Sequence, residues 1–556
     1  MTSIIISRWK LTAGRQNESN SMTSKLKIAL LLFTIILVAA VLRLYGLSLR
    51  PMHTDEAVHA FKFGQLLENG TYIFDKNEYH GPTLNYLTLL PARLASYGTF
   101  ASLDESILRL VPALAGLLIV LVLALLAGSI GWKMVLTASF LLAVSPPLVY
   151  YSRYYIHETL LVLFNLGFIV FLYRYLRSGR AVWIIAAGVF GGLMVATKST
   201  WVIIVAAQMA ALFLTGYVYR RSGMASSFRA VALRPVYIAI FLFSGGAVSV
   251  LFYSSFFSNP AGIADSVTTY GEYFHRAGPE GLHIHPWHYY FRIMASESCG
   301  PLPFRADVWL LITGFAGMAM AIAGIFQAIT GKSKQPGIHP VFFFTAITAL
   351  LTIVTFSALP YKTPWNILAF YVPMAVLSAY FILSMANRTA SRTTRGAHTL
   401  ILIIISSHLI WQSYSDNFIA YDRPCNPWTY AHPGTDVIAI AGEAAKAASV
   451  SPEGNNMYIE IIVPDNGYWP LPWYLREFPN TGWWEYVNMD APAAPLIICA
   501  PEYTAQLTRK LFEIPPPGQR RLYIPLMDHD PQLRPGVSVS LYLRKDHYDR
   551  YAEKFR

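Results

Sequence analysis

Long apolar segments alternate with short polar segments over most of the chain. Because these segments are close to 20 residues long and carry few charges, they predict roughly eleven transmembrane helices. The sequence therefore predicts an α-helical polytopic membrane protein. We expect the spans at Ile28–Leu47, Ile107–Ile130, Met134–Tyr151, Thr159–Leu176, Ala181–Ala196, Trp201–Tyr217, Val236–Phe256, Val308–Ile329, Pro340–Leu359, Ile367–Met385 and Thr399–Tyr414.

Basic residues gather in every second loop between these spans. Lys25 and Lys27 precede the first span, for example, and Arg174 and Arg177 follow the fourth. Since Lys and Arg mark cytoplasmic loops, these loops share the cytoplasmic side and the N-terminus lies there too. The other loops, which hold most of the acids and histidines, are predicted to lie outside the cytoplasm.

The alternation also predicts the domain organisation. Residues 1–27 form a basic cytoplasmic tail, and residues 28–415 form a transmembrane module with external loops at 48–106 and 257–307. Residues 416–556 contain more proline and charge and no further span, which predicts a soluble external α/β domain. Its expected elements are helices at Val437–Ala448 and Glu502–Phe512, and strands at Met457–Val463, Leu496–Cys499 and Ser538–Leu543.

Composition excludes several classes of protein. The 556 residues are 54% hydrophobic and only 13% charged, with a net charge of +12. The basic residues form no patch with base-stacking aromatics, so we expect no nucleic-acid partner. The absence of a GxxxxGK[ST] phosphate loop argues against a nucleotide-driven pump. Of the three cysteines, Cys299 and Cys425 could meet outside the membrane, although their separation argues neither way.

The first external loop begins with an acid pair, Asp55 and Glu56, directly after the first span. Charges at a membrane surface are costly unless they are solvated or functional. The alternative is structural, because acids favour the N-terminus of a helix and Thr54 or Asp55 could cap one there. Glu78 and His80 flank a Gly-Pro turn in the same loop, before a helix expected at Tyr86–Tyr97, although no turn requires them.

These residues give four candidate bases or ligands, namely Asp55, Glu56, Glu78 and His80. One base with a raised pKa could take a proton from an acceptor hydroxyl.

Three cations are predicted on the same external face. Pro146-Pro147 is expected to bend the third span. Arg153 follows it and either pairs with Glu158 or an interfacial phosphate, or grips a lipid-linked phosphate. Lys198 and Lys362 stand alone between apolar spans, where they either reach toward the interface or contact phosphate.

Two further clusters have competing interpretations. His283-x-His285-x-x-His288 suggests a metal, but its spacing is not a specific zinc signature. Interface histidines or substrate hydrogen bonds are favoured there, and we assign no metal ligand. Aromatic residues at Tyr468–Tyr474 and Trp483-Trp484 are interpreted as core plus interface belt, with a shelf for a sugar or lipid chain as the alternative.

Several motifs together resemble the GT-C membrane glycosyltransferases. The Asp-Glu pair, the turn before a helix and the arginine after a kinked span are similar to glycosyltransferase family 39, which includes protein mannosyltransferases and lipid A aminoarabinose transferases. The resemblance is stronger still to the flippase activity-associated membrane proteins of prokaryotes. The segments that carry it are Arg50–Ala60, Tyr79–Pro82, Asn426–His432 and Tyr468–Leu475.

The resemblance implies an inverting transfer from a polyprenyl-phosphate sugar to an acceptor outside the cytoplasm. Asp55 would be the general base or acceptor-orienting carboxylate, with Glu56 beside it, and Arg153 would hold the donor phosphate. Lys198 and Lys362 match the family's cations in role and side only. The His-Gly-Pro turn replaces the usual Pro-Pro turn, which leaves the donor open.

The resemblance also sets the expected partners and location. They are a polyprenyl-phosphate sugar, the lipid bilayer, and an acceptor glycan, lipid or protein, at the inner (plasma) membrane. No cofactor is certain, and a divalent cation, Mg²⁺ or Mn²⁺, is left open. The main alternative is a non-enzymatic accessory or transporter that assists flipping of lipid-linked sugars, although no inverted repeats support it. A glycan polymerase or ligase is the third interpretation.

Overall fold

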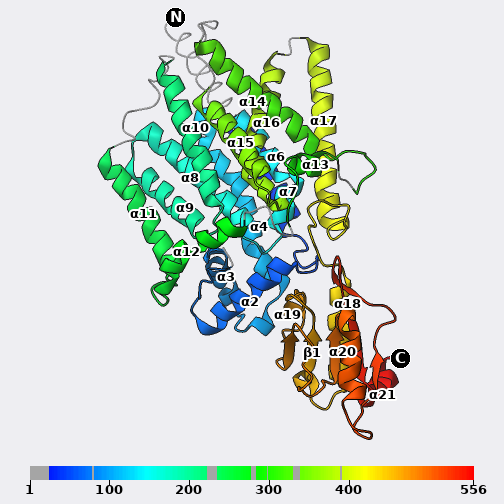
Figure 1. Cartoon of the computed structure of the whole chain (residues 1–556). Helices are drawn as coiled ribbons and strands as arrows, with labels where there is room; N and C mark the ends of the chain where they lie inside the picture. Colours follow the sequence, from blue (N-terminus) through cyan, green and yellow to red (C-terminus); the bar gives the residue numbers. More distant parts are fainter. Residues whose placement is uncertain are drawn as a thin grey trace, which may run out of the picture.

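A bundle of long helices is followed by a small mixed sheet in the computed structural model (Figure 1). The structure describes residues 24–77, 80–221, 234–276, 283–296, 299–329, 339–388 and 391–556. Glu78, one of the candidate residues, lies outside these ranges.

All eleven expected apolar segments are helical where the structure describes them. Among the described residues, eight helices are long and apolar enough to cross a membrane by length and composition, or nine if a bent pair counts as one span. The remaining two expected spans, α9 and α17, fall outside that set because α9 is short and α17 is more polar. The bounds are Ser24–Leu44 for the first helix, then α4 (Glu105–Val122), α6 (Trp132–Ala143), α7 (Pro146–Ser152), α8 (Glu158–Ser178), α9 (Ala181–Val195), α10 (Trp201–Arg221), α11 (Pro235–Tyr253), α14 (Asp307–Ile329), α15 (Pro340–Ala358), α16 (Leu368–Arg388) and α17 (Arg392–Tyr414).

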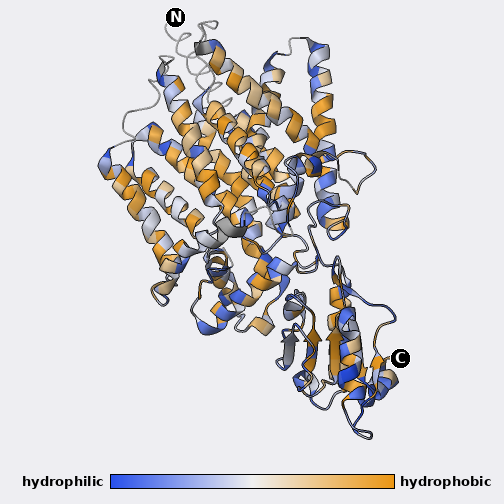
Figure 2. Ribbon diagram, viewed as in Figure 1, coloured by the Kyte–Doolittle hydropathy of each residue, from blue (hydrophilic) through white to orange (hydrophobic). Residues whose placement is uncertain are grey.

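The outer surface of the bundle is apolar, as a bilayer requires. Large side chains such as Phe213 on α10 and Phe243 on α11 are exposed, and Figure 2 shows hydrophobic residues along most of the long helices. Exposed apolar surface on this scale marks a membrane or partner contact. The predicted class of fold, a polytopic α-helical membrane protein, is therefore confirmed.

The bent pair α6 and α7 confirms the predicted proline kink. The two helices meet at 63°, because Pro146 begins α7 and Ser145 caps it by accepting a hydrogen bond from the Leu148 N–H at 3.2 Å. The break leaves the last carbonyls of α6 without helical partners. The buried guanidinium of Arg43 satisfies two of them, at Leu142 and Ala143, with hydrogen bonds of 2.9 Å each.

Four shorter helices are α2 (Thr54–Asn69), α3 (Thr83–Leu94), α12 (Ala261–Arg276) and α13 (Tyr289–Ala295). Of these, α2 and α3 lie between the bundle and the sheet (Figure 1). α3 replaces the helix expected at Tyr86–Tyr97 and begins three residues earlier, directly after the Gly-Pro turn.

The segment after α17 packs into the helical part before the sheet begins. Cys425 forms a disulfide with Cys299, and the buried Arg305 pairs with Asp307 and Asp416. Trp428 is fully buried and donates from Nε1 to Asp416 at 3.1 Å. These contacts join the segments around 299–307 and 416–428 to each other.

The C-terminal part contains a five-stranded sheet in the order β2-β1-β3-β7-β4. β1 pairs in parallel with β2 and β3, whereas β7 is antiparallel to β3 and β4. Two separate apolar clusters show that both faces are covered. The bounds are β1 (Ile459–Ile462), β2 (Thr481–Trp484), β3 (Leu496–Cys499), β4 (Tyr523–Pro525), β7 (Ser540–Arg544), a small hairpin of β5 (Gln532–Arg534) and β6 (Val537–Ser538), and helices α18 (Asp436–Val450), α19 (Leu471–Tyr474), α20 (Thr504–Thr508) and α21 (Lys545–Phe555).

The aromatic run around α19 attaches this sheet to the helical part. Trp473 is fully buried and donates from Nε1 to Glu105 at 2.8 Å, while the Tyr474 hydroxyl accepts from the Met52 N–H at 2.8 Å. These two residues therefore belong to the buried core, which is one part of the simpler interpretation of the aromatic run. They place the sheet directly against the start of α2.

Candidate active site

The first turn of α2 separates the two acids of the predicted pair. Glu56 is fully buried, and its carboxylate accepts from Arg109 Nε at 2.7 Å and Arg109 Nη2 at 2.8 Å. It also accepts from the backbone N–H groups of His53 at 3.0 Å and Tyr155 at 2.8 Å. Burial alone would raise the pKa of Glu56, but the Arg109 charge and these hydrogen bonds lower it to about 2.

Glu56 is thus held in a structural ion pair. Arg109, on α4, also donates to the carbonyls of Leu47, Arg50 and Pro51, which fixes the chain before α2. With both carboxylate oxygens occupied, Glu56 has the helix-start role that the sequence left as an alternative. The N-cap is His53 rather than Thr54 or Asp55.

Arg153 is also engaged by the protein itself. Its guanidinium donates to the carbonyls of Leu42, Tyr45 and Gly46, at 3.2, 2.6 and 2.7 Å, just after the first membrane helix. It also lies over the ring of Phe418 at 4.6 Å. The geometry favours a brace on the end of that helix over the predicted grip on phosphate.

Arg153→Lys is expected to lower the free energy of unfolding by about 1–3 kcal/mol. The two terminal nitrogens of the guanidinium donate to the carbonyls of Leu42, Tyr45 and Gly46, and the single ammonium of lysine cannot reach all three. Thermal unfolding of the purified protein measures this. If stability is unchanged while binding of polyprenyl phosphate is lost, Arg153 holds phosphate as the sequence predicted.

Asp55 lies beside a group of aromatic and histidine side chains from three loops that the sequence predicts to be external. His53 Nε2 is 2.9 Å from the Tyr430 carbonyl, and the Tyr430 hydroxyl is 2.5 Å from His283 Nδ1 and 3.2 Å from His285 Nε2. The charge of Asp55 acts on His283, whose pKa is nonetheless lowered by burial. Asp55 is half-buried, and no hydrogen bond to its carboxylate is formed within the described ranges.

Lys362 completes this group of residues. Its amino group donates to the His285 carbonyl at 2.9 Å and to the Leu359 carbonyl, and its backbone N–H donates to the His283 carbonyl at 2.9 Å. Two carbonyls leave one of the three ammonium donors for another ligand. Burial lowers the pKa of Lys362. The structure therefore brings Asp55 and Lys362 to the same layer of loops, through their shared contacts with the segment at His283 and His285.

Three other candidates, His80, Glu158 and Lys198, form a second group. It lies close to α2 at His59, one turn after Asp55. Lys198 pairs with Glu158, and the chain at His80 forms a β-bridge with Lys198. Gly81 lets these two turns approach, since a Cβ there would lie 2.0 Å from the Ala196 carbonyl oxygen. His80, Glu158 and Lys198 therefore meet in space, although they are far apart in the sequence.

Two histidines that the sequence did not single out as site residues join this second group. His59 lies on α2, one turn after Asp55, and His157 lies just before α8. Burial lowers the pKa of both, to about 3 for His157, and neighbouring Lys198 lowers both further. Both imidazoles are therefore neutral at physiological pH. His59 stands in the first-loop run, so its spacing from Asp55 is the signal that could have found it.

Arg109 and Tyr430 were also missed by the sequence-based reasoning. Arg109 carries a charge inside an apolar span, which is costly unless it is paired. That rule alone would have marked Arg109 and its need for a buried acid. Tyr430 lies in the Asn426–His432 motif, but nothing in its local sequence indicates that it contacts His283 and His285.

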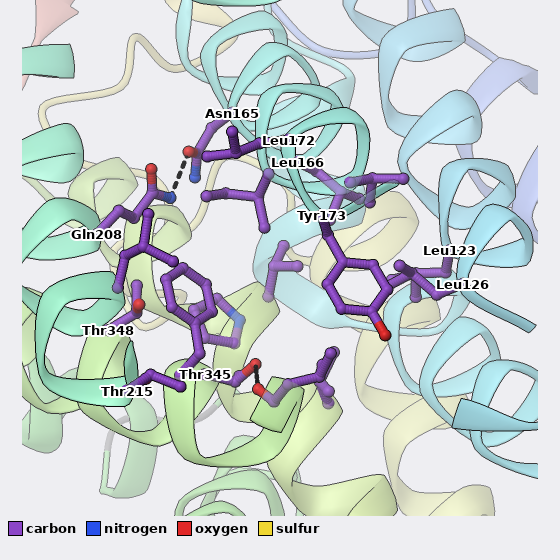
Figure 3. Close-up of a pocket in the computed structure, with 18 of the residues that line it drawn as sticks. Leu123, Leu126, Asn165, Leu166, Leu172, Tyr173, Gln208, Thr215, Thr345 and Thr348 are labelled. Carbon is purple, nitrogen blue, oxygen red and sulfur yellow. Dashed lines mark hydrogen bonds between the residues drawn. The ribbon is translucent and has the colours of Figure 1, made fainter. Parts of the chain in front are cut away.

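The described residues also enclose an apolar cavity of about 120 Å³ within the bundle (Figure 3). Leu166, Tyr173, Gln208 and Thr345 help to line it, and Gln208 donates to Asn165 at 2.6 Å. The lining residues come mainly from α8, α10, α15 and the first half of α16. The cavity is suited to apolar groups, and Asp55 and Lys362 are not among the residues that line it.

The arrangement of the helices defines a class of membrane protein. The structure aligns with ArnT from Cupriavidus metallidurans in the apo state, with a TM-score of 0.54 at 13% identity over 93% of this chain and 98% of that one. ArnT bound to undecaprenyl phosphate aligns with a TM-score of 0.52 at 15% identity over 92% and 97%. The chain has the GT-C fold of membrane glycosyltransferases.

A family model agrees with this fold. Residues 80–245 match the dolichyl-phosphate-mannose-protein mannosyltransferase family, which confirms the resemblance for that part of the chain. The apo oligosaccharyltransferase of Archaeoglobus fulgidus also aligns, with a TM-score of 0.52 at 15% identity over 82% of this chain. The chain spans 64% of the length of that protein. No curated protein sequence matches the chain.

Proposed function

We propose that this protein is a glycosyltransferase that moves a sugar from a polyprenyl-phosphate donor to an acceptor hydroxyl. The observation that carries the proposal is the contrast between two acids. Asp55 is half-buried and its carboxylate has no hydrogen bond among the described residues, whereas Glu56 is bonded to Arg109 and to two backbone N–H groups. The shared fold supports the donor class. ArnT was solved with undecaprenyl phosphate, and the archaeal enzyme AglB with a dolichol-phosphate and an inhibitory peptide.

The proposed chemistry is a single displacement at the anomeric carbon. Asp55 accepts the proton of the acceptor hydroxyl as the new glycosidic bond forms. The bond from the anomeric carbon to the phosphate oxygen breaks, and polyprenyl phosphate leaves with the electron pair. One displacement inverts the anomeric centre, so no second carboxylate nucleophile is needed. The proposed reaction therefore needs only Asp55 as a catalytic carboxylate, and Glu56 can have a structural role.

Positive charge near Asp55 would stabilise the leaving phosphate. Lys362 is the cation in the same external layer that keeps an ammonium donor beyond its two carbonyl partners. Lys198 is nearby but already paired with Glu158. We therefore assign the donor phosphate to Lys362 and regard Arg153 as a brace. Fixed charges aimed at a leaving group in a partly dry site contribute strongly to catalysis.

On this proposal residues 28–415 form the catalytic module, and the acidic layer and residues 416–556 lie outside the cytoplasm. The alternation of basic loops supports this orientation. The Cys299–Cys425 disulfide supports it as well, because such bonds persist in oxidising compartments.

A single introduced thiol tests the orientation. Cys299 and Cys425 are bonded to each other, and burial raises the pKa of Cys499 to about 12, so native thiols react little. In Ile73→Cys, at a side chain that is 75% exposed, we expect labelling by a membrane-impermeant maleimide in intact cells. Labelling only after the membrane is permeabilised would place the Asp55 layer in the cytoplasm.

Transfer itself is tested with the purified protein in liposomes. A radiolabelled polyprenyl-phosphate sugar is supplied with a membrane extract as acceptor, and a sugar nucleotide replaces it in a parallel reaction. We expect labelled acceptor from the lipid-linked donor alone. If the labelled lipid crosses the bilayer and no acceptor is labelled, the protein assists flipping instead.

A further inference from the structure

Three histidines from separate parts of the chain converge beside the candidate site. His59 comes from α2, His80 from the turn before α3, and His157 from the link between α7 and α8. One ring nitrogen of each lies within 4.8 Å of the other two. The ring centroids of His59 and His157 are 4.7 Å apart, and each is 5.0 Å from that of His80.

His157 is already oriented like a metal ligand. Its Nε2 lies 2.9 Å from the Gly81 carbonyl oxygen, to which it can only donate. The proton on Nε2 leaves a lone pair on Nδ1, which is buried and lacks a hydrogen-bond partner among the described residues. A histidine that binds metal through one nitrogen commonly donates from the other to a backbone carbonyl.

The burial of these groups also needs an explanation. His59 and His157 are 5% and 1% exposed, and the neighbouring Glu158 Oε2 is a second buried polar atom without a partner in the described part of the chain. A buried polar group without a hydrogen bond costs about 1–3 kcal/mol. A bound ion would satisfy Nδ1 and offset the cost of packing three imidazoles together.

We propose that His59, His80 and His157 bind one divalent transition-metal ion of the zinc class. Three imidazoles suit Zn²⁺ and its neighbours, whereas Mg²⁺ and Mn²⁺ prefer oxygen ligands. Zinc–nitrogen bonds of about 2.1 Å in a tetrahedron need nitrogens about 3.4 Å apart, so the rings have to close in by roughly 1 Å. Three protein ligands leave a fourth position open, on the side of the less buried His80.

The charges around the cluster tolerate a cation. Lys198 is paired with Glu158, and Lys62 lies 3.8 Å from Asp75, so each nearby lysine has a carboxylate close to it. These three histidines are not those of the His283-x-His285-x-x-His288 motif, which suggested a metal site in the sequence. His288 is exposed, and His283 and His285 contact Tyr430.

Metal content of the purified full-length protein tests the site. After its affinity tag is removed, the protein is stripped with EDTA, loaded with Zn²⁺ or Co²⁺ and freed of excess ion. We expect about one ion per chain, and for Co²⁺ the visible absorption of a tetrahedral nitrogen site. His59→Gln and His157→Gln are expected to lose the ion, and the exposed His288→Gln is the matched control that keeps it.

His80→Gln separates loss of the ion from loss of the fold, because His80 is only half-buried and the variant should fold like the wild type. We expect it also to lose the ion. Absence of bound Zn²⁺ from the loaded wild type would overturn the proposal, as would a His80→Gln protein that holds as much as the wild type. The readout is metal content without any donor, so it stands apart from the outcome of the transfer assay.

Discussion

Asp55→Asn is expected to lower the rate of sugar transfer by about 100- to 10,000-fold, the usual contribution of a general base. Asparagine has nearly the same shape but cannot accept the proton of the acceptor hydroxyl. Because no hydrogen bond to the Asp55 carboxylate is formed among the described residues, the thermal unfolding midpoint should stay at the wild-type value. Initial rates with labelled polyprenyl-phosphate sugar measure the effect.

The matched control is Asp265→Asn on α12, which changes another half-buried acid in the expected external loops. Its transfer rate should equal that of the wild type. A wild-type rate in Asp55→Asn would exclude Asp55 as the base.

Glu56→Gln is expected to have the opposite profile, with a loss of about 3–5 kcal/mol in the free energy of unfolding. The substitution leaves the buried guanidinium of Arg109 without its counter-charge, while the carbonyls of Leu47, Arg50 and Pro51 cannot replace a carboxylate. Thermal or denaturant unfolding in detergent measures the loss. Glu68→Gln, an exposed acid at the end of the same helix, is the control and should be neutral.

The same ion pair has a pH signature. Folding lowers the pKa of Glu56 from its ordinary value near 4.3 to about 2. Its contribution to stability is therefore complete above about pH 5 and is lost as the pH falls from there toward 2. Glu56→Gln should flatten this acid limb. If Glu56→Gln instead abolishes transfer at unchanged stability, Glu56 rather than Asp55 is the catalytic carboxylate.

The sequence predicted much of the fold because membrane helices are governed by local composition. Apolar length located the spans, and Pro146 marked the kink where α6 ends. The strand at Leu496–Cys499 was predicted at its observed bounds. β2 was missed because its residues, Gly482 followed by Trp483 and Trp484, do not alternate between apolar and polar side chains. Only the pairing with β1 makes this segment a strand.

The helix expected at Glu502–Phe512 shows the limit of local pattern within the sheet region. The structure has only a short α20 followed by a single π turn at Arg509–Glu513. Lys510 explains the distortion in part, because its amino group turns inward to the buried Glu460 at 2.6 Å. Such a tertiary ion pair leaves no trace in the spacing of apolar residues.

Candidate residues could be chosen from the sequence, but their roles depended on partners far along the chain. The sequence predicted Glu56 as a catalytic residue and Arg153 as a phosphate ligand, and it gave no sign of their contacts with Arg109 and with the carbonyls around Tyr45. His59 and His157 are 98 positions apart in the sequence and meet only when α2 packs near the start of α8. The motifs therefore indicated which segments carry the candidate residues, whereas the contacts of each residue could be known only from the structure.

A donor labelled with ³H in the sugar and ³²P in the phosphate tests the central claim most directly. If the protein is a glycosyltransferase of the proposed kind, ³H appears in the acceptor while an equal amount of ³²P stays in the lipid as free polyprenyl phosphate. If both labels move together, whether into the acceptor or across the bilayer, the anomeric carbon–oxygen bond has not been broken and the claim is contradicted.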